Sequence, residues 1–504
     1  MILPGAPLSP NHFSGKAAFD NGLLMLDNIE GKLGSGTFRT SGKLLPGQSV
    51  DLTYDGTAID LQTTRKMLDA LKIKAPSILQ KPFSGLVRHA NMTIKGPYAR
   101  PQVVIIAQPE DIYSQPFGKG RTFELTDGTL KITGQTLTLN KVIGKIGKGT
   151  FKLDGTTGFT PGAPIDISYT GRSVDVGTLK LALNELGLST AFFNPAIAGD
   201  VDGAVGTIRG TVRDPHVNLS LVPHGILYQP LGTERMIELV GGRVDIVGPV
   251  LRFQRVKGLL GKGGFSLDGT TGIGSNHNID VHFTAHDLDL SHVKVALLEL
   301  NVHSPLLAEQ LLFGRVRNVA LDVKGKMENP DIKLACVPND VLYEPIGSTR
   351  AMHLQQGRIT YRNDVLQLTG VNVRSPRSRY NATLTIARLS RPDSQLKSLD
   401  VQAELFDITD LHSYLQAPKT PPAVRKQYLT LLQRLQMTPQ RGKLRGHLLF
   451  TAADAAGDYN YEGDVVIDRV GITAQDLPLT DVSGSLRTDN HKLFLQNLTG
   501  KLGT

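Results

Sequence analysis

The stretch from Pro215 to Met236, PHVNLSLVPHGILYQPLGTERM, recurs along this chain and decides the fold. It returns from Pro330 as PDIKLACVPNDVLYEPIGSTRAM and, in a more diverged form, from Pro101 as PQVVIIAQPEDIYSQPFGKGRTF, at spacings of 115 and 114 residues. A fixed period is the signature of repeat proteins, in which each unit packs on its neighbours. We therefore predict one repetitive structure rather than a set of independent globular domains.

The period continues beyond this stretch. The segment ELTDGTLKITGQTLTLNKVIGKIGKGTFKLDGTTG from Glu124 aligns with ELVGGRVDIVGPVLRFQRVKGLLGKGGFSLDGTTG from Glu238. We predict a partial repeat over 1–86, full repeats over 87–200, 201–315 and 316–441, and a partial repeat over 442–504, all in one continuous sheet. Because neither end carries a polar capping unit, we expect an internal piece of a longer chain, with a signal or anchor upstream.

Apolar and polar residues alternate within each repeat. Val217, Leu219 and Leu221, for example, are separated by Asn218 and Ser220. Alternation with period two is typical of half-buried antiparallel strands, which we expect to be about five to seven residues long. Tight hairpins need a positive φ, which glycine supplies. We place such turns at Asp127-Gly128, Asp154-Gly155, Gly241-Gly242 and Asp268-Gly269.

An aspartate followed by an amphipathic stretch closes each repeat. Asp60, Asp175, Asp289 and Asp410 precede RKMLDALKI, LKLALNELGL, VKVALLELNV and RKQYLTLLQRLQM. Because Asp is a favoured N-cap, we predict one helix per repeat of about 115 residues. One helix, about 10 Å wide, is too narrow to cover an apolar sheet face of about 20 Å. The predicted fold is therefore mainly β, an elongated, repetitive antiparallel sheet whose uncovered apolar face must stack on a second sheet, close on itself, or curl into a gutter around something apolar.

Composition excludes several classes of protein. The net charge of +9 includes no run of five or more like charges, and aromatic residues make up 6% of the chain, so we expect no nucleic-acid partner. A single cysteine, Cys336, excludes an internal disulfide framework and a multi-cysteine metal site. Cys336 continues the apolar row of Ile332 and Leu334, which favours a small buried hydrophobic residue over a nucleophile.

Catalytic and metal-binding motifs are weak in this sequence. Gly144, Gly147 and Gly149 in GKIGKGT do not match a phosphate-binding loop, and they predict a hairpin connection instead. His282 and His286 share a strand face and could bind a metal, but the sequence places no third ligand beside them. We therefore interpret them as solvated strand histidines, and we predict no catalytic residue, no metal, no cofactor and no enzymatic activity.

The sequence pattern that recurs between the strands resembles that of a known family. The segment GTIRGTVRDPHVNL from Gly206 is similar to the repeat sequence pattern of the AsmA-like superfamily, which includes bridge-like lipid transfer proteins of the AsmA, TamB and YhdP type. The resemblance implies that the sheet is curled into a U-shaped hydrophobic groove, and that the protein belongs to the cell envelope, lies in the periplasm and conducts phospholipids between the inner and outer membranes for outer membrane biogenesis. It also implies an inner-membrane anchor upstream, contacts with both membranes through parts of the chain not present here, and an outer-membrane protein as a candidate partner.

The alternating rows supply the residues of the predicted groove, which would contact phospholipid acyl chains. An adhesin-like or purely structural β-solenoid with a packed interior and no lipid transport stays open as the alternative. The predicted lining residues are Val103, Ile105, Leu137, Leu139, Ile165, Ile167, Val217, Leu219, Leu221, Leu251, Phe253, Ile279, Val281, Phe283, Ile332, Leu334, Leu366 and Leu368.

Three arginines recur at the same place in the repeats. Arg121, Arg235 and Arg350 each lie three residues after the glycine of a Pro-x-Gly sequence. Two roles are open for them. Each arginine could tie down its loop by donating hydrogen bonds to backbone carbonyls, or could guide phosphate headgroups at the rim of the groove.

Overall fold

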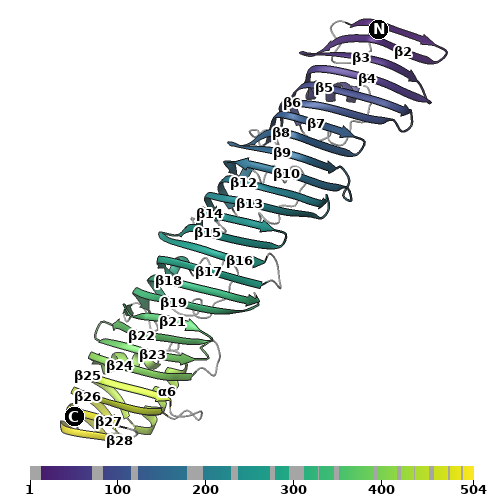
Figure 1. Ribbon diagram of the computed structural model, residues 1–504. Coiled ribbons are helices and arrows are strands. Elements are labelled where there is room, and N and C mark those ends of the chain that lie inside the picture. The colour runs from purple at the N-terminus through teal and green to yellow at the C-terminus, as the bar shows by residue number, and fades with distance from the viewer. Residues whose placement is uncertain are drawn as a thin grey trace. The chain divides into compact units, whose positions relative to one another are not determined.

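A computed structural model shows a chain made almost entirely of strands (Figure 1). It describes residues 13–70, 83–114, 123–178, 197–228, 237–272, 278–293, 312–326, 328–344, 351–389, 395–416, 422–435, 437–452, 459–474, 477–489 and 492–503. Two compact units are present, the first made of Met1–Glu234 with Leu239–Phe253 and the second of Arg235–Glu238 with Gln254–Thr504. The predicted mainly β, antiparallel and continuous sheet is confirmed, because the 28 described strands belong to one sheet.

The first unit is a meander that begins at β1. Its elements are β1 (Phe13–Asp20), β2 (Leu23–Leu33), β3 (Gly36–Leu45), β4 (Ser49–Asp60), α1 (Leu61–Ala70), β5 (Phe83–Pro97), β6 (Gln102–Ser114), β7 (Phe123–Thr133), β8 (Thr136–Ile146), β9 (Gly149–Gly158), β10 (Pro164–Arg172), β11 (Val174–Asp175), β12 (Ile197–Thr211), β13 (Pro215–Tyr228), most of β14 (Ile237–Val247) and the start of β15 (Val250–Leu260).

The second unit continues the same antiparallel pattern. Its further elements are β16 (Gly263–Gly272), β17 (Asn278–Asp289), β18 (Leu312–Lys326), β19 (Asn329–Tyr343), β20 (Met352–Gln355), β21 (Arg358–Arg362), β22 (Val365–Arg374), β23 (Arg379–Ala387), β24 (Gln395–Asp407), α5 (Ile408–Gln416), α6 (Pro422–Leu435), β25 (Met437–Ala452), β26 (Tyr459–Ala474), β27 (Leu477–Asp489) and β28 (Lys492–Leu502).

The predicted turns at four glycine-containing pairs are wrong. Asp127-Gly128, Asp154-Gly155, Gly241-Gly242 and Asp268-Gly269 all lie inside strands, so most strands are longer than the predicted five to seven residues. Gly155 has a φ of +136°, and a Cβ at this position would lie 2.0 Å from the carbonyl oxygen of Asp166 on the neighbouring strand. The glycine is therefore needed for close approach of two strands.

Hairpin turns lie instead at the other glycines. Gly147 occupies the two-residue turn between β8 and β9 with a φ of +56°, as the sequence predicted for the GKIGKGT segment. Gly34 and Gly261 hold the corresponding turns after β2 and β15, with φ of +62° and +60°. The left-handed conformation costs glycine little, which explains why the turn recurs at this residue.

Asp154 and Asp268 do not form the predicted turns, and each accepts a hydrogen bond at a β-bulge of the neighbouring strand instead. Lys141 in β8 has a φ of +49°, and its N–H donates to Oδ1 of Asp154 at 2.7 Å. Arg255 in β15 repeats this geometry, with an N–H to Oδ1 distance of 2.6 Å to Asp268. The extra residue of a bulge leaves a backbone N–H outside the ladder, and the carboxylate satisfies that N–H.

The predicted aspartate caps are correct in three repeats. The Oδ1 atoms of Asp60 and Asp175 accept hydrogen bonds from the N–H groups of Thr63 and Thr178 at 2.6 and 2.5 Å, and Asp289 accepts one from the N–H of Ser291 at 2.8 Å. Helical turns begin at residues 176 and 290, but the remainder of LKLALNELGL and VKVALLELNV lies outside the described residues. A helix in every repeat therefore stays a prediction.

The fourth cap differs from the prediction. Asp407 caps α5, because its Oδ1 accepts the N–H of Thr409 at 3.0 Å. Asp410 lies within the first turn of α5, is buried, and accepts a hydrogen bond from the hydroxyl of Ser375 at 3.1 Å. A second helix, α6, carries most of the RKQYLTLLQRLQM segment, and the hydroxyl of Tyr428 in α6 lies 2.8 Å from Nδ1 of His412 in α5.

Candidate functional site: an open apolar strip

The strand register brings the predicted groove residues of the first unit onto one face of the sheet. Directly paired residues in an antiparallel ladder project to the same side. The row through Ile105 crosses nine strands from β4 to β13 and ends at Pro215. It contains no charged side chain, and its members are Tyr54, Met92, Ile105, Ile132, Leu137, Thr157, Ile165, Gly210 and Pro215.

A parallel row lies two residues along each strand. Leu139 pairs with Gly155, Gly155 pairs with Ile167, and Ile167 leads through Ile208 to Val217. Alternation then places the other predicted residues of these strands, among them Val103, Leu219 and Leu221, on this same face. The face on which the first unit collects its apolar side chains is thus continuous from strand to strand.

The second unit has the same arrangement. The row through Phe283 and Leu334 again lacks a charged side chain, and it consists of Leu267, Phe283, Leu321, Leu334, Tyr361, Leu366, Ile386 and Leu396. Val281 pairs with Val323, which pairs with Ile332, in the adjacent row. Leu368 pairs with Ile359 and Leu384 on that face as well, while Ile279 precedes Val281 by two residues.

We call the eighteen predicted groove residues the apolar strip. Its side chains are neither covered nor fully exposed: sixteen are half-buried, Leu139 is buried, and Ile332 is 36% exposed. Leu251 and Phe253 in β15 belong to the half-buried group and alternate with the exposed Val250 and Arg252. Half-exposure along so many strands differs from a packed interior, in which large apolar side chains lose nearly all contact with water.

The bulges separate this strip from a closed core on the same face. Val142, just beyond the bulge at Lys141, pairs with Leu153 and is 0% exposed. Val256 and Val371, which follow the corresponding positions in β15 and β22, are also 0% exposed. The apolar face therefore has two zones along each of these strands, a closed core beyond the bulge and an open strip before it.

The beginnings of the helices lie at the closed zone. A Cβ added at Gly147 in the β8–β9 turn would be 3.3 Å from the hydroxyl oxygen of Thr178, and one added at Gly261 would be 2.6 Å from a ring nitrogen of His292. Val293 packs against the buried cluster of the second unit, which comprises Leu260, Ala285, Leu288, Leu290, Val316, Val319, Cys336 and Val341. Burial of this zone, not of the strip, supplies the main apolar stabilisation here.

The opposite face carries the charges. Cross-strand ion pairs join Arg209 to Asp166 at 3.2 Å and Lys324 to Asp280 at 3.1 Å, and Nδ1 of His282 lies 2.6 Å from Oδ1 of Asp322. Exposed pairs of this kind each contribute at most about 1 kcal/mol to stability. They do, however, make one face polar and leave the other apolar.

Some of the remaining candidate residues lie in the buried zone or on the polar face, and the others lie outside the described part of the chain. Arg121, Arg235 and Arg350 lie outside the described residues. Cys336 is buried as predicted, and burial raises the pKa of its thiol to about 11. His286 is exposed, and among the described residues no group of three or more His, Cys, Asp or Glu side chains could hold a metal ion.

Several members of the strip's rows were not predicted from the sequence. Ile132 and Ile208 alternate with polar residues in KIT and TIRG, so period two could have identified them. Tyr169 projects to the same face and lies over Gly206, where a Cβ would be 2.7 Å from its hydroxyl. Burial raises the pKa of the Tyr169 hydroxyl.

No described helix is both long enough and apolar enough to cross a membrane. Comparison with known proteins gives no assignment, since no protein-family model matches the chain and no curated protein matches it either.

Proposed function

We propose that the apolar strip binds the acyl chains of phospholipids, and that the protein conducts these lipids along a U-shaped groove between the inner and outer membranes of a cell envelope. The observation that supports this proposal is the half-exposure of the strip, combined with rows that contain no charged side chain. The function is binding and transfer rather than catalysis.

The energetics of the strip favour a hydrocarbon ligand. Each methylene group removed from water contributes about 0.8 kcal/mol, so an acyl chain that lays roughly ten methylenes on the strip would gain about 8 kcal/mol before the cost of ordering. A half-exposed apolar surface of this extent is unusual for a protein without a partner on it. Because the rows run from strand to strand, an acyl chain that moves along them meets no charged side chain, and only β9, with Gly155 and Thr157, interrupts the apolar side chains from β8 to β10.

The repeat sequence pattern around Gly206 supports the same proposal, because it resembles that of the AsmA-like superfamily. Under the proposal the protein works in the periplasm, and its anchor and its contacts with the two membranes belong to other parts of a longer chain. The alternative, a structural solenoid, would need the strip to be packed, as the closed core around Val142 and Val256 is.

A site-specific photo-crosslinker tests the proposal. A photoreactive residue at Ile167 on the strip should crosslink phospholipid, whereas the same residue at Asp166, its neighbour on the polar face, should not. Mass spectrometry of the adduct identifies the lipid. Equal crosslinking at both positions, or none at Ile167, would contradict the proposal.

Transfer is tested with a matched pair on β13. Leu219→Asp places a carboxylate in the strip and should abolish transfer of phospholipid between vesicles, because an acyl chain passing the carboxylate would have to displace its water at a cost of several kcal/mol. Asn218→Asp adds the same charge on the opposite face and should leave transfer unchanged. Circular dichroism should show both variants folded.

A further inference from the structure

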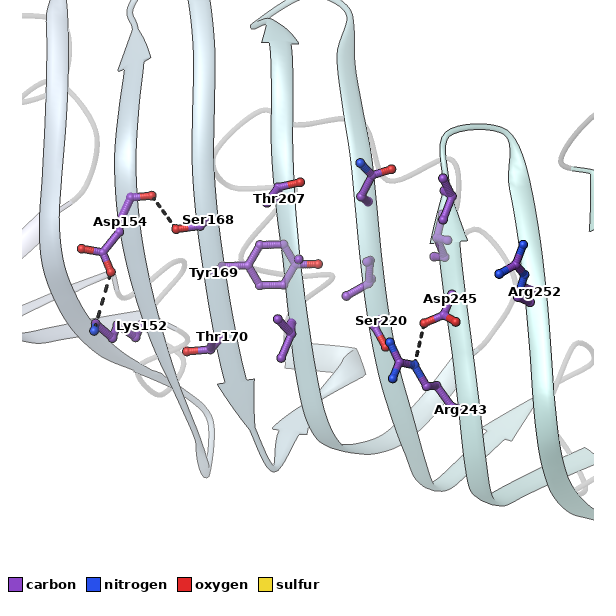
Figure 2. A pocket seen from close by; sticks show the side chains of 16 residues that line it. Lys152, Asp154, Ser168, Tyr169, Thr170, Thr207, Ser220, Arg243, Asp245 and Arg252 are labelled. Carbon is purple, nitrogen blue, oxygen red and sulfur yellow. Dashed lines mark hydrogen bonds and ion pairs between the residues drawn. The ribbon is translucent and has the colours of Figure 1, made fainter.

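The polar face of the first unit contains a cavity that the proposed function does not use. Figure 2 shows it spread over β9, β10, β12, β13, β14 and β15, with Lys152 and Asp154 at one end and Arg243, Asp245 and Arg252 at the other. Its volume is about 650 Å³. Small-molecule sites typically measure about 300–1,000 Å³, so the cavity could take a ligand of one or two sugar units.

One end of the cavity has more positive than negative charge. Nε of Arg243 donates to Oδ1 of Asp245 at 2.8 Å, and the charge of Arg252 acts on the same carboxylate. Burial on its own would raise the pKa of Asp245, but hydrogen bonds from Arg243 and Ser220 and the two guanidinium charges outweigh it and lower that pKa. Two cations thus share one carboxylate, which leaves an anion-binding corner.

The floor of the cavity consists of small polar side chains. The register aligns Asp154, Ser168, Thr207 and Asn218 in one cross-strand row. Hydroxyl and amide groups can both donate and accept hydrogen bonds, as the hydroxyl groups of a sugar require. Val205 and Val247, which also line the cavity, are 60% and 56% exposed and offer an apolar surface for the C–H groups of a sugar ring.

In the next repeat, larger side chains occupy the corresponding row. Asp268 caps its bulge just as Asp154 does, and the row that begins at Asp268 continues through His282 and Asp322 to Lys333. The His282–Asp322 pair, at 2.6 Å, occupies the positions that correspond to Ser168 and Thr207. The same fold therefore accepts large paired side chains here, and the first unit has small hydroxyl residues instead.

From these observations we propose that the cavity binds an anionic saccharide, with Arg243 and Arg252 holding its phosphate or carboxylate group and the row from Ser168 to Asn218 contacting the sugar hydroxyls. The charged and hydroxyl side chains of the site project from the face opposite the apolar strip, and although Tyr169 and the strip residue Leu219 also line the cavity, the proposal does not depend on lipid transport.

Binding of glucose 6-phosphate to the purified full chain tests the proposal, measured by saturation-transfer NMR with glucose and inorganic phosphate as parallel probes. Arg252→Gln, which introduces the residue found at the corresponding Gln367, should weaken glucose 6-phosphate binding about tenfold or more. Arg209→Gln removes an equal charge from the same face outside the cavity, where Arg209 pairs with Asp166, and should change binding less than twofold.

A filling variant gives an independent test. Ser168→His combined with Thr207→Asp copies the pair of the next repeat and should abolish binding while the circular-dichroism spectrum stays unchanged. The proposal is overturned if glucose 6-phosphate does not bind, or if Arg209→Gln weakens binding as much as Arg252→Gln. Equally tight binding of inorganic phosphate would overturn the assignment of a saccharide. If the double variant fails to fold, the comparison of glucose 6-phosphate binding by Arg252→Gln and Arg209→Gln still tests the proposal.

Discussion

Two aspartate substitutions on β8 distinguish an open strip from a packed interior. Leu137 and Val142 project from the same face of this strand, since Leu137 pairs with Thr157 and Val142 with Leu153. Leu137 is half-buried on the strip, whereas Val142 is 0% exposed in the closed core. The same carboxylate introduced at either position therefore meets two different environments.

The expected losses of stability follow from burial. Complete burial of a leucine side chain contributes about 1.5–3 kcal/mol, so Leu137→Asp, which loses most of that contribution but can keep its carboxylate in contact with water, should destabilise the fold by about 1–2 kcal/mol. Val142→Asp loses the full transfer energy of valine and also forces a carboxylate out of water. Its cost should be about 5 kcal/mol or more, enough to unfold the surrounding strands.

Urea denaturation followed by circular dichroism measures both variants, and it suits a chain that has no tryptophan. Thr136→Asp, at an exposed position of the same strand, is the control and should shift the free energy of unfolding by less than about 0.5 kcal/mol. If Leu137→Asp were as destabilising as Val142→Asp, the strip would be part of a packed core and the reasoning about a groove would fail.

Three further predictions concern the whole chain and its individual side chains. Limited proteolysis should not release stable fragments of one repeat, because the strands share one sheet, and fragments of about 115 residues would contradict this. If Arg121, Arg235 and Arg350 guide headgroups, their triple change to Gln should slow lipid transfer between vesicles with little change in melting temperature, whereas a large loss of stability with normal transfer would support the loop-tying role. Because burial raises the pKa of Cys336 to about 11, the thiol stays protonated at pH 8, and a thiol reagent should modify it only after denaturant is added; rapid modification of the folded chain would contradict its burial.

The sequence predicted the strands and their apolar faces well, because alternation is a local signal. Ile165 and Ile167 alternate with exposed residues in the structure, as they do in the sequence. Turns were harder to predict. Asp154-Gly155 has the composition of a hairpin turn, yet the aspartate caps a bulge and the glycine allows close approach of two strands. Those roles depend on the neighbouring strand, which a dipeptide does not reveal.

The division of the apolar face into two zones could not be predicted either. A bulge interrupts the period of two, so the sequence gives no continuous pattern from Leu139 to Val142. Similarly, Asp407 and Asp410 are equally plausible caps in sequence, and only the start of α5 and the contact between Asp410 and Ser375 distinguish them. The cavity on the polar face could not be predicted from the sequence, because a single strand does not show that Ser168 and Thr207 are paired.

The meander has a consequence for how the chain acquires its structure. The described pairings join strands that follow one another, or nearly so, along the chain, as β8 follows β7 and β26 follows β25. Closing a short turn such as the one between β7 and β8 costs little entropy, and each new strand finds an edge already in place. During synthesis the sheet can therefore lengthen strand by strand as residues leave the ribosome, with no need to wait for a distant segment, and the newest edge is the surface that is most open to wrong pairing at each moment.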